Sequence, residues 1–231
     1  MDGPHPIRLA MLGRQGAGKG TQCVRLSHHF AIPHISTGDM LRAAVRANTP
    51  FGQKASEFME RGELVSDEVI TGVVSERLGE NDTRVRGFIL DGFPRTVAQA
   101  GALQEILAPG GLLAVVDLDV PLEVVKARLF SRRVCAVCGA NYSVEVFPKV
   151  EGICDVCGGE IVQRPDDTEE AISRRLELYE EMTRPLTEYY RRLGLLEVVD
   201  GIGSLDEVME RILAALRGRG IEGQVFGGQD S

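Results

Sequence analysis

The chain has 231 residues, of which 43% are hydrophobic and 26% are charged, and its formal net charge at pH 7 is −8. This length can build one sizeable core with insertions, and the composition is ordinary for a soluble globular protein. An acidic chain argues against a general nucleic-acid binder, whose surface would be basic. No apolar run is long enough to span a membrane, and residues 1–6 lack the features of a signal peptide. We therefore expect a cytoplasmic protein that binds neither nucleic acid nor membrane.

The segment from Leu9 to Thr21 joins an apolar run to a glycine-rich loop that ends in a lysine. The loop, Gly13 to Lys19, fits the pattern G-x-x-x-x-G-K, with an expected strand at residues 7–12 and an expected helix at residues 20–30. Backbone N–H groups of such a loop and the helix N-terminus hold phosphates, while the lysine adds a mobile positive charge. An isolated match can also be a simple glycine turn, so the flanking strand and helix are what favour nucleotide binding.

The rest of the chain alternates between short apolar runs and helical patterns. Further strands are expected at residues 32–35, 87–91, 112–118 and 195–199. Further helices are expected at residues 39–47, 51–61, 66–78, 97–107, 121–132, 168–192 and 204–216. The long helix carries an apolar stripe of Ile172, Leu176, Tyr179 and Met182, whereas residues 1–6 and 217–231 are expected to be irregular or disordered. This order predicts an α/β fold with a mostly parallel, doubly wound sheet.

Charged side chains lie at strand ends and on the helix that follows. Asp91 ends the expected strand 87–91, where a carboxylate suits a Walker-B position that holds Mg²⁺ through its water shell. The alternative is an aspartate that caps a turn. Arg128 and Arg132 lie four residues apart and share one helix face, which is either a solvated basic face or part of a phosphate site. Gly13, Ser36, Asp91 and Asp119 all follow expected strand ends. Ligands of such sheets bind outside the carboxyl ends of the strands, so we expect the motifs to converge on one crevice.

Four cysteines interrupt the alternation of strands and helices. Cys135, Cys138, Cys154 and Cys157 form C-x₂-C-x₁₅-C-x₂-C, a spacing typical of zinc sites. Two disulfides or four free thiols are the alternatives, and the lack of a secretory signal disfavours disulfides. Four protein ligands leave no open coordination position, so we expect a structural Zn²⁺. The fifth cysteine, Cys23, is expected to be a small buried core residue.

Taken together, several motifs occur in a characteristic order. These are GRQGAGKGTQ, ISTGDMLRAAV, LVSD, FILDGFPRT with Gln99, the cysteine segment 132–157, and QRPDD followed by RRL. In these motifs residues 7–216 resemble the adenylate kinase family, in its long form with a metal-binding lid. The resemblance implies a P-loop core with a five-stranded parallel sheet flanked by helices, a helical insertion that binds a nucleoside monophosphate, and a small β-rich lid. The implied bounds are residues 1–35, 66–132 and 170–231 for the core, 36–65 for the monophosphate domain and 133–169 for the lid.

The resemblance also implies the reaction ATP + AMP = 2 ADP, with Mg²⁺, direct in-line transfer and closure of the lid, in a monomer that serves adenine nucleotide homeostasis. ATP would be bound by Gly16, Ala17, Gly18, Lys19, Gly20, Thr21, Arg128, Arg132, Asn141, Tyr142 and Gly203. AMP would be bound by Thr37, Arg42, Glu63, Leu64, Val65, Gly92, Arg95, Gln99, Arg164 and Arg175. The catalytic set would be Lys19, Asp91, Arg95, Arg132, Arg164 and Arg175.

Three positions need comment beside this assignment. Gly20 stands where nucleotide-binding loops usually carry the Ser or Thr that contacts Mg²⁺, and this departure fits the family. Glu63 stands where backbone contacts to AMP are expected, and such contacts tolerate a change of side chain. Gln99 has a carboxamide that can both donate to and accept from an adenine edge, although a solvated helix glutamine is the alternative. Asp166 and Asp167 would connect the lid to the core or orient the arginines.

Phosphoryl transfer asks for these residue types, because it needs in-line positioning and neutralised oxygens rather than a covalent intermediate. Lys19, Mg²⁺ and the arginines supply that charge, and no phosphoenzyme is expected. One alternative is a nucleoside-monophosphate kinase with another base preference, which Thr37 and Gln99 disfavour. A second alternative is a P-loop sensor or zinc-knuckle nucleic-acid module without turnover, which the negative net charge and the arginine set disfavour.

Overall fold

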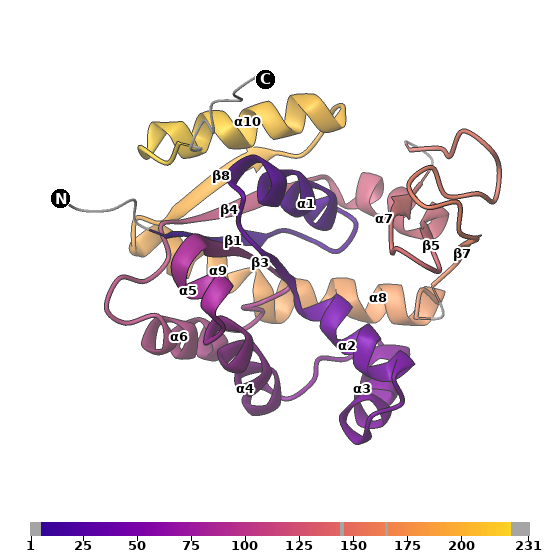
Figure 1. Cartoon of the computed structure of the whole chain (residues 1–231), viewed down its shortest axis with the longest axis horizontal. Helices are drawn as coiled ribbons and strands as arrows, with labels where there is room; N and C mark the ends of the chain where they lie inside the picture. Colours follow the sequence, from indigo (N-terminus) through magenta and orange to yellow (C-terminus); the bar gives the residue numbers. More distant parts are fainter. Residues whose placement is uncertain (1–5, 144–145, 165, 223–231) are drawn as a thin grey trace, which may run out of the picture.

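A five-stranded parallel sheet forms the centre of the computed structural model, which describes residues 6–143, 146–164 and 166–222. The strands follow the order β2-β3-β1-β4-β8 and every neighbouring pair is parallel, as predicted (Figure 1). Their bounds are Ile7–Leu12 for β1, His34–Ser36 for β2, Gly87–Asp91 for β3, Ala114–Asp119 for β4 and Leu196–Asp200 for β8. A helical crossover joins strands that pair in parallel, so the carboxyl ends of all five strands lie at one edge.

Both faces of the sheet are buried, since side chains of a strand alternate between its two faces. In β1, Leu9 and Met11 pack into one apolar cluster, and Ala10 and Leu12 pack into the other. The first cluster is completed by helices α1 (Lys19–Phe30), α7 (Leu122–Ser131), α8 (Glu169–Leu178) and α10 (Leu205–Gly218). The second is completed by α4 (Asp67–Leu78), α6 (Val97–Ile106) and α9 (Pro185–Arg192), opposite α1 and α10 (Figure 1). The predicted place of Cys23 in the core is confirmed, because its side chain is fully buried.

Polar caps fix the points where helices begin near the carboxyl edge of the sheet. The Ser36 hydroxyl accepts a hydrogen bond from the Asp39 N–H, which starts α2 (Thr37–Arg46) directly after β2. Thr96 and Thr168 cap α6 and α8 in the same way. Ser204 forms a full capping box with Glu207 at the start of α10. Each cap ends the preceding loop at a defined residue, so the loops that carry the site are held at both ends.

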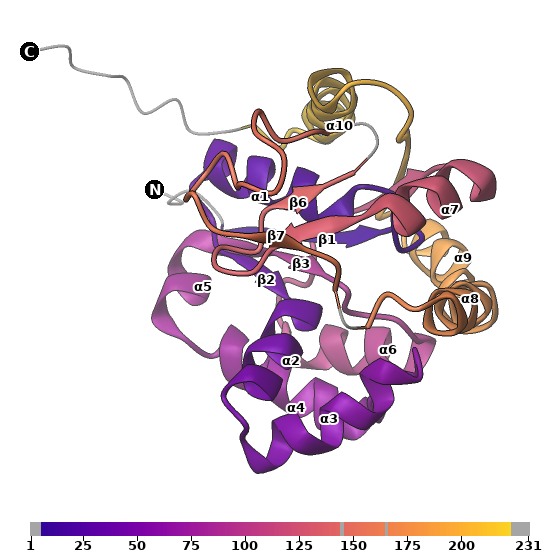
Figure 2. The same cartoon turned by 90° about the vertical axis from the view of Figure 1, so that its right-hand side faces the viewer.

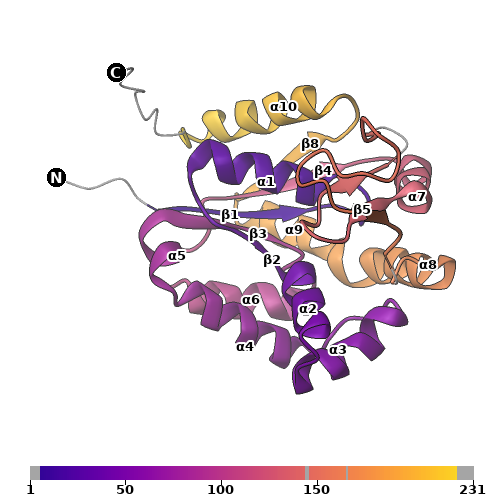
Figure 3. The ribbon, with the colours of Figure 1, turned by 45° about the vertical axis from the view of Figure 1, so that its right-hand side comes forward.

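Two excursions leave the central layers. Helices α2 and α3 (Pro50–Glu60) pack against each other between β2 and α4, on the side of the molecule seen in Figure 2. The second excursion joins α7 to α8 and contains an antiparallel sheet of order β6-β5-β7, which we name the small sheet. Its strands are β5 (Arg133–Cys135), β6 (Asn141–Tyr142) and β7 (Ile161–Val162). Figure 3 shows the small sheet at the carboxyl end of β1, between α7 and α8.

The helix expected over residues 168–192 is interrupted. Five residues, Tyr179–Thr183, form a π-helical turn (η1) in which the Tyr179 carbonyl accepts from the Arg184 N–H at 2.8 Å. The extra residue shifts the phase of the helix, so Met182 is 42% exposed and does not continue the stripe of Ile172 and Leu176. Pro185 explains the break, because it lacks an N–H and its ring crowds the carbonyl four residues before it.

Other differences concern element ends. Helix α5 (Asn81–Arg86) was not expected, because its six residues are too few to show a helical period. The expectation of disorder from residue 217 is wrong for residues 217–222, since α10 runs to Gly218 and Ile221 packs into the core. Residues 1–5 and 223–231 lie outside the described residues. Within the described part of the chain, no helix has the length and apolar character needed to cross a bilayer.

Candidate active site

A cleft of about 320 Å³ opens at the carboxyl edge of the central sheet. Its walls come from the loop after β1, the helical pair α2 and α3, the end of β3, the small sheet, α8 and the loop after β8. Every residue that the sequence assigned to ATP, to AMP or to catalysis lines this one cleft. Of the four residues expected at strand ends, Gly13, Ser36 and Asp91 line the cleft and Asp119 does not, so the expected convergence at the carboxyl edge is confirmed for three of them.

The loop between β1 and α1 forms the floor of the cleft. Lys19 begins α1, and its ammonium donates to the carbonyls of Gly13 at 2.6 Å and Arg14 at 2.9 Å. Burial lowers the pKa of Lys19, and the nearby carboxylate of Asp91 partly offsets that effect. Gly16 has φ +86°, and a Cβ there would lie 2.9 Å from the Leu129 side chain. Only glycine allows α7 to pack this closely on the loop.

Asp91 ends β3 beside the loop, as predicted for a Walker-B carboxylate. Its Oδ2 lies 3.6 Å from His34 Nε2, and a Cβ on Gly20 would lie 3.3 Å from the same oxygen. Burial by itself would raise the pKa of Asp91, but His34, Lys19 and Arg95 outweigh it and hold the pKa below its usual range. The carboxylate is therefore ionised near neutral pH, and the missing side chain at Gly20 leaves room in front of it.

A second group of residues surrounds the turn that follows β3. The hydroxyl of Thr37 donates to the Gly92 carbonyl at 2.9 Å, and Arg95 Nε donates to the same oxygen at 2.8 Å. Gly92 has φ +79°, and a Cβ there would lie 2.8 Å from the Thr37 hydroxyl. Gln99 is 2% exposed, and its amide oxygen accepts from the Arg95 N–H at 2.7 Å. This wall thus holds a hydroxyl, a guanidinium and an amide in fixed positions.

Arginines from the far wall are held by two buried carboxylates. Arg132 donates to Asp167 at 2.7 Å through Nε, and Arg175 donates to Asp166 at 2.7 Å and to Asp167 at 3.3 Å. Arg175 also donates to the Met59 carbonyl at 2.9 Å, which connects α8 to the end of α3. The predicted orienting role of Asp166 and Asp167 agrees with these pairs.

The cleft is strongly cationic where these walls meet. Burial, followed by the positive charges of Arg132 and Arg42, lowers the pKa of Arg164 to about 10. Burial together with Asp91, Arg175 and Arg42 governs Arg95, whose pKa is also below its usual range. Guanidiniums crowded in this way match the several charged oxygens of polyphosphates, which they contact in bidentate fashion. The arrangement favours a substrate with closely spaced phosphate groups.

The Asp167→Asn substitution should lower the free energy of unfolding by about 3 kcal/mol, because it removes the carboxylate paired with the largely buried Arg132 and one of the two carboxylates paired with Arg175. The Asp167 side chain is 1% exposed, so solvent cannot replace the lost charge. Urea titration monitored by circular dichroism measures the change. The matched control is Glu188→Gln, which removes exposed pairs with Arg191 and Arg192 and should cost less than about 1 kcal/mol. Equal losses for both variants would contradict the prediction.

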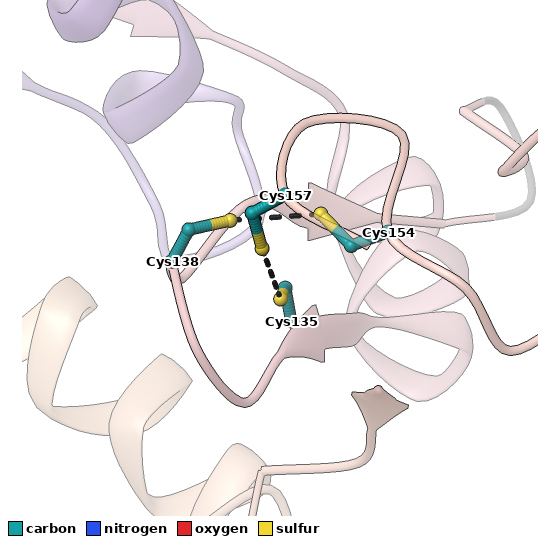
Figure 4. Close-up of side chains that lie close together, drawn as sticks. All are labelled: Cys135, Cys138, Cys154 and Cys157. Atoms are coloured by element: carbon teal, nitrogen blue, oxygen red, sulfur yellow. Dashed lines mark hydrogen bonds between the residues drawn. The ribbon is translucent and has the colours of Figure 1, made fainter. Parts of the chain in front are cut away.

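The four cysteines of the small sheet and its loops face one another (Figure 4). The Sγ atoms lie 3.5 Å apart in the pairs Cys135–Cys157 and Cys138–Cys154, and all four lie within 4.8 Å of one another. A disulfide would need about 2.05 Å. A tetrahedron with Zn–S bonds of about 2.3 Å has edges of about 3.8 Å, which is close to the observed spacing. The donor set and its geometry thus fit a four-thiolate metal centre and exclude two disulfides.

Tyr142 contacts the four-cysteine centre through its hydroxyl group. Its hydroxyl donates to Cys154 Sγ at 3.3 Å and accepts from the Asp155 N–H at 2.8 Å. The hydrogen bond from Tyr142 lowers the pKa of Cys154 to about 6, which favours the thiolate that a metal requires. Tyr142 was expected to contact ATP. The residue does line the cleft, but its hydroxyl is already engaged within the small sheet.

Replacement of Tyr142 by phenylalanine should weaken metal binding by roughly tenfold, since outer hydrogen bonds to a metal ligand have effects of that order. Transfer of zinc to a chromogenic chelator, followed over time, gives the release rate. Tyr189→Phe removes a hydroxyl that bonds to Gln104 instead and should release zinc at the wild-type rate. An unchanged release rate for the Tyr142 variant would show that its hydroxyl does not support the centre.

Comparison with known proteins agrees with this geometry. Residues 11–195 match the family model described as adenylate kinase. A protein named adenylate kinase from Thermodesulfovibrio yellowstonii is 53% identical over 213 residues, covering 91% of this chain and 99% of the relative. The chain belongs to the adenylate kinase family. Proteins of the same name from Carboxydothermus hydrogenoformans and Geobacter sp. (strain M21) are 50% and 52% identical over 214 residues, covering 91% of this chain and 100% of each relative. Family membership confirms the resemblance that the motifs indicated.

Two residues that hydrogen-bond to cleft side chains of this adenylate kinase family member were not predicted from the sequence. The amide of Gln15, within the glycine-rich loop, accepts from Arg132 at 2.9 Å and Arg175 at 3.1 Å when its oxygen faces them. The pattern G-x-x-x-x-G-K leaves this position unspecified, so no motif points to it. Asp67 belongs to the LVSD motif of the family resemblance, but no role was predicted for it, although its carboxylate accepts a hydrogen bond from Gln99. Both residues act across long sequence separations, which a local pattern does not report.

Proposed function

We propose that this protein transfers the γ-phosphoryl group of ATP to AMP in a reversible, Mg²⁺-dependent and direct in-line reaction that yields two ADP. One observation carries the proposal: all the residues assigned to ATP, to AMP and to catalysis line one cationic cleft. The adenylate kinase name of the relatives supports the same substrates. The reaction would serve adenine nucleotide homeostasis.

On the side of the glycine-rich loop, backbone N–H groups and Lys19 would bind the phosphates of ATP. Arg128 donates to the Ala17 carbonyl at 3.4 Å, so its guanidinium already lies over the loop. Arg132, Asn141, Tyr142 and Gly203 would complete the ATP site. Asp91 would hold Mg²⁺ through its water shell, and the ionised state of this carboxylate fits that task. When bound, Mg²⁺ supplies positive charge to the phosphate oxygens.

On the opposite side, the wall around Gly92 would bind AMP. Thr37, Arg42, residues 63–65, Gly92, Arg95 and Gln99 would contact the monophosphate, its sugar and its base. Arg164 and Arg175 would approach from the far wall and bridge the two nucleotides. Positive charge from both sides would fall on the oxygens of the transferring group, where negative charge shifts during the reaction. Transfer then needs alignment of the two phosphates and no covalent enzyme intermediate.

We further propose a division into a core (1–35, 66–132 and 170–231), a monophosphate-binding domain (36–65) and a lid (133–169). Closure of the lid would exclude water, which would otherwise consume ATP by hydrolysis. The lid would hold a structural Zn²⁺ on Cys135, Cys138, Cys154 and Cys157. The enzyme would act as a monomer in the cytoplasm, which light scattering of the purified protein and cell fractionation would test.

The decisive experiment is an assay of ADP formation with ATP and Mg²⁺ against AMP, GMP, CMP and UMP in turn. Turnover with AMP, with two ADP formed for each AMP consumed and little inorganic phosphate released, is the expected result. Faster turnover with another monophosphate would transfer the proposal to a different acceptor. Nucleotide binding without any transfer would overturn it.

A further inference from the structure

The orientation of the Gln99 amide is fixed by two neighbours, the carboxylate of Asp67 and the backbone N–H of Arg95. Its nitrogen donates to Asp67 Oδ1 at 2.7 Å, and its oxygen accepts from the Arg95 N–H at 2.7 Å. Asp67 is the first residue of α4 and does not line the cleft. The other oxygen of Asp67 accepts from the Thr96 hydroxyl at 2.7 Å, and the Thr96 hydroxyl in turn caps α6 at Gln99. Asp67 is thereby held in place by the helix that carries Gln99.

This pairing allows only one orientation of the amide. A carboxylate has only acceptor atoms and a backbone N–H is only a donor. If the Gln99 amide were reversed, its oxygen would face Asp67 and its nitrogen would face the Arg95 N–H. Two acceptors would then face each other at Asp67, and two donors would face each other at Arg95. In a buried site such unsatisfied polar groups are costly. Each amide atom uses one hydrogen-bonding position for these contacts and keeps one more for a ligand.

The fixed orientation has a chemical consequence for a purine placed against Gln99. The Watson–Crick edge of adenine offers a donor at the 6-amino group and an acceptor at N1. Hypoxanthine and guanine reverse this pattern, because they carry a 6-oxo acceptor and an N1–H donor. An amide can satisfy either pattern, but only in opposite orientations. A site with a freely reversible amide would therefore discriminate weakly between 6-amino and 6-oxo purines.

We propose that Asp67 is a positioning residue that sets the base specificity of the monophosphate site by fixing the Gln99 amide in the orientation that matches a 6-amino purine. The inference rests on the proposed function, in which AMP is the acceptor. Asp67 acts through Gln99 and touches no substrate. Its carboxylate selects against 6-oxo purines by making the reversed amide unfavourable.

The test compares AMP and IMP as acceptors at fixed ATP and Mg²⁺, because IMP differs from AMP only at the 6-position and N1. Asn in place of Asp67 can donate or accept, so it tolerates either orientation of Gln99. In Asp67→Asn the AMP:IMP ratio of kcat/KM should fall by roughly tenfold, since one of the two contacts no longer favours a single orientation of the Gln99 amide. The change should appear in KM for AMP and in IMP turnover, while KM for ATP and kcat at saturating AMP stay close to the wild-type values.

Two further variants separate positioning from a merely structural effect. Glu68→Gln removes a charge from the same first helical turn and should leave the AMP:IMP ratio unchanged, since Glu68 is exposed. In a Gln99→Ala background, Asp67→Asn should no longer alter the ratio, because the amide on which Asp67 acts is gone. A ratio unchanged by Asp67→Asn, or still changed by it in the Gln99→Ala background, overturns the inference. Failure of the wild-type protein to phosphorylate AMP would instead overturn the proposed function.

Discussion

The Lys19→Ala protein is expected to form ADP about a thousandfold more slowly than the wild-type protein, with its fold intact. Among the residues that the structure describes, Lys19 is the only lysine that lines the cleft, and its ammonium donates to two carbonyls of the glycine-rich loop. Removal of one preorganised charge that stabilises a transition state typically costs a hundred- to a thousandfold, and we expect the upper part of this range for a part-buried cation held by two hydrogen bonds to the loop. Initial rates of ADP formation at saturating ATP and AMP measure the effect.

Stability separates this loss of activity from unfolding. Burial lowers the pKa of Lys19, which means that the charged ammonium destabilises the folded state. Removal of this charge should therefore not lower the melting temperature. The control is Lys126→Ala, which removes an exposed lysine of α7 paired with Glu123 and should keep full activity. More than a tenth of wild-type activity in Lys19→Ala would contradict the assigned role of the ammonium.

Removal of the proposed Zn²⁺ is expected to unfold the proposed lid, residues 133–169, while the central sheet stays folded. Within the described part of residues 133–169, the apolar cluster of the small sheet has three buried members, Cys135, Tyr142 and Cys154, of which two are cysteines of the centre. A segment with so small an apolar core needs a bound metal or a similar cross-link in order to fold. Structural zinc typically contributes about 10–16 kcal/mol of folding free energy in comparable small sites. Addition of a zinc chelator should therefore produce a low-temperature transition, followed by the unfolding of the core.

Hydrogen exchange locates that first transition. Amides of residues 133–143 and 146–162 should lose protection in chelator, while those of β1 and β4 keep it. ADP formation should fall more than tenfold, because the lid arginines lose their positions. Cys138→Ser should reproduce the effect, whereas Cys23→Ala, which alters a buried core thiol, should keep full zinc content. A single transition that the chelator does not move would contradict the prediction.

Sequence reasoning was sufficient where local chemistry decides the structure. Alternating apolar runs predicted the five strands. The spacing of the four cysteines predicted that their thiols gather at one metal site instead of forming two disulfides. Ser36 and Thr168 indicate in the sequence where helices begin, since a capping hydroxyl accepts from an N–H within three residues of its own position. These features depend on short stretches, so the chain alone reports them.

Features that depend on packing were not accessible in the same way. The η1 turn depends on tertiary packing, because Ile172 and Leu176 of α8 belong to one apolar cluster and Leu186 and Tyr190 of α9 belong to the other. A period of 3.6 residues cannot show the inserted residue. The contact between Asp67 and Gln99 spans 32 positions, and the two sites lie in separate motifs. Gln15 lies in a loop whose pattern leaves its side chain undefined. In each case the missing information was the partner rather than the residue.

The η1 turn also explains how α8 and α9, which follow one another along the chain, can direct side chains toward two different parts of the molecule. In a continuous α-helix each residue adds about 100° of rotation, so one inserted residue turns everything before it by that angle relative to everything after it. Leu186 and Tyr190 of α9 face the apolar core, while Arg175 of α8 faces the cleft. Loss of a single residue from Tyr179–Thr183 would keep the core contacts of α9 and swing Arg175 out of line with the nucleotides. At this point in the chain, the length of the segment matters as much as its composition.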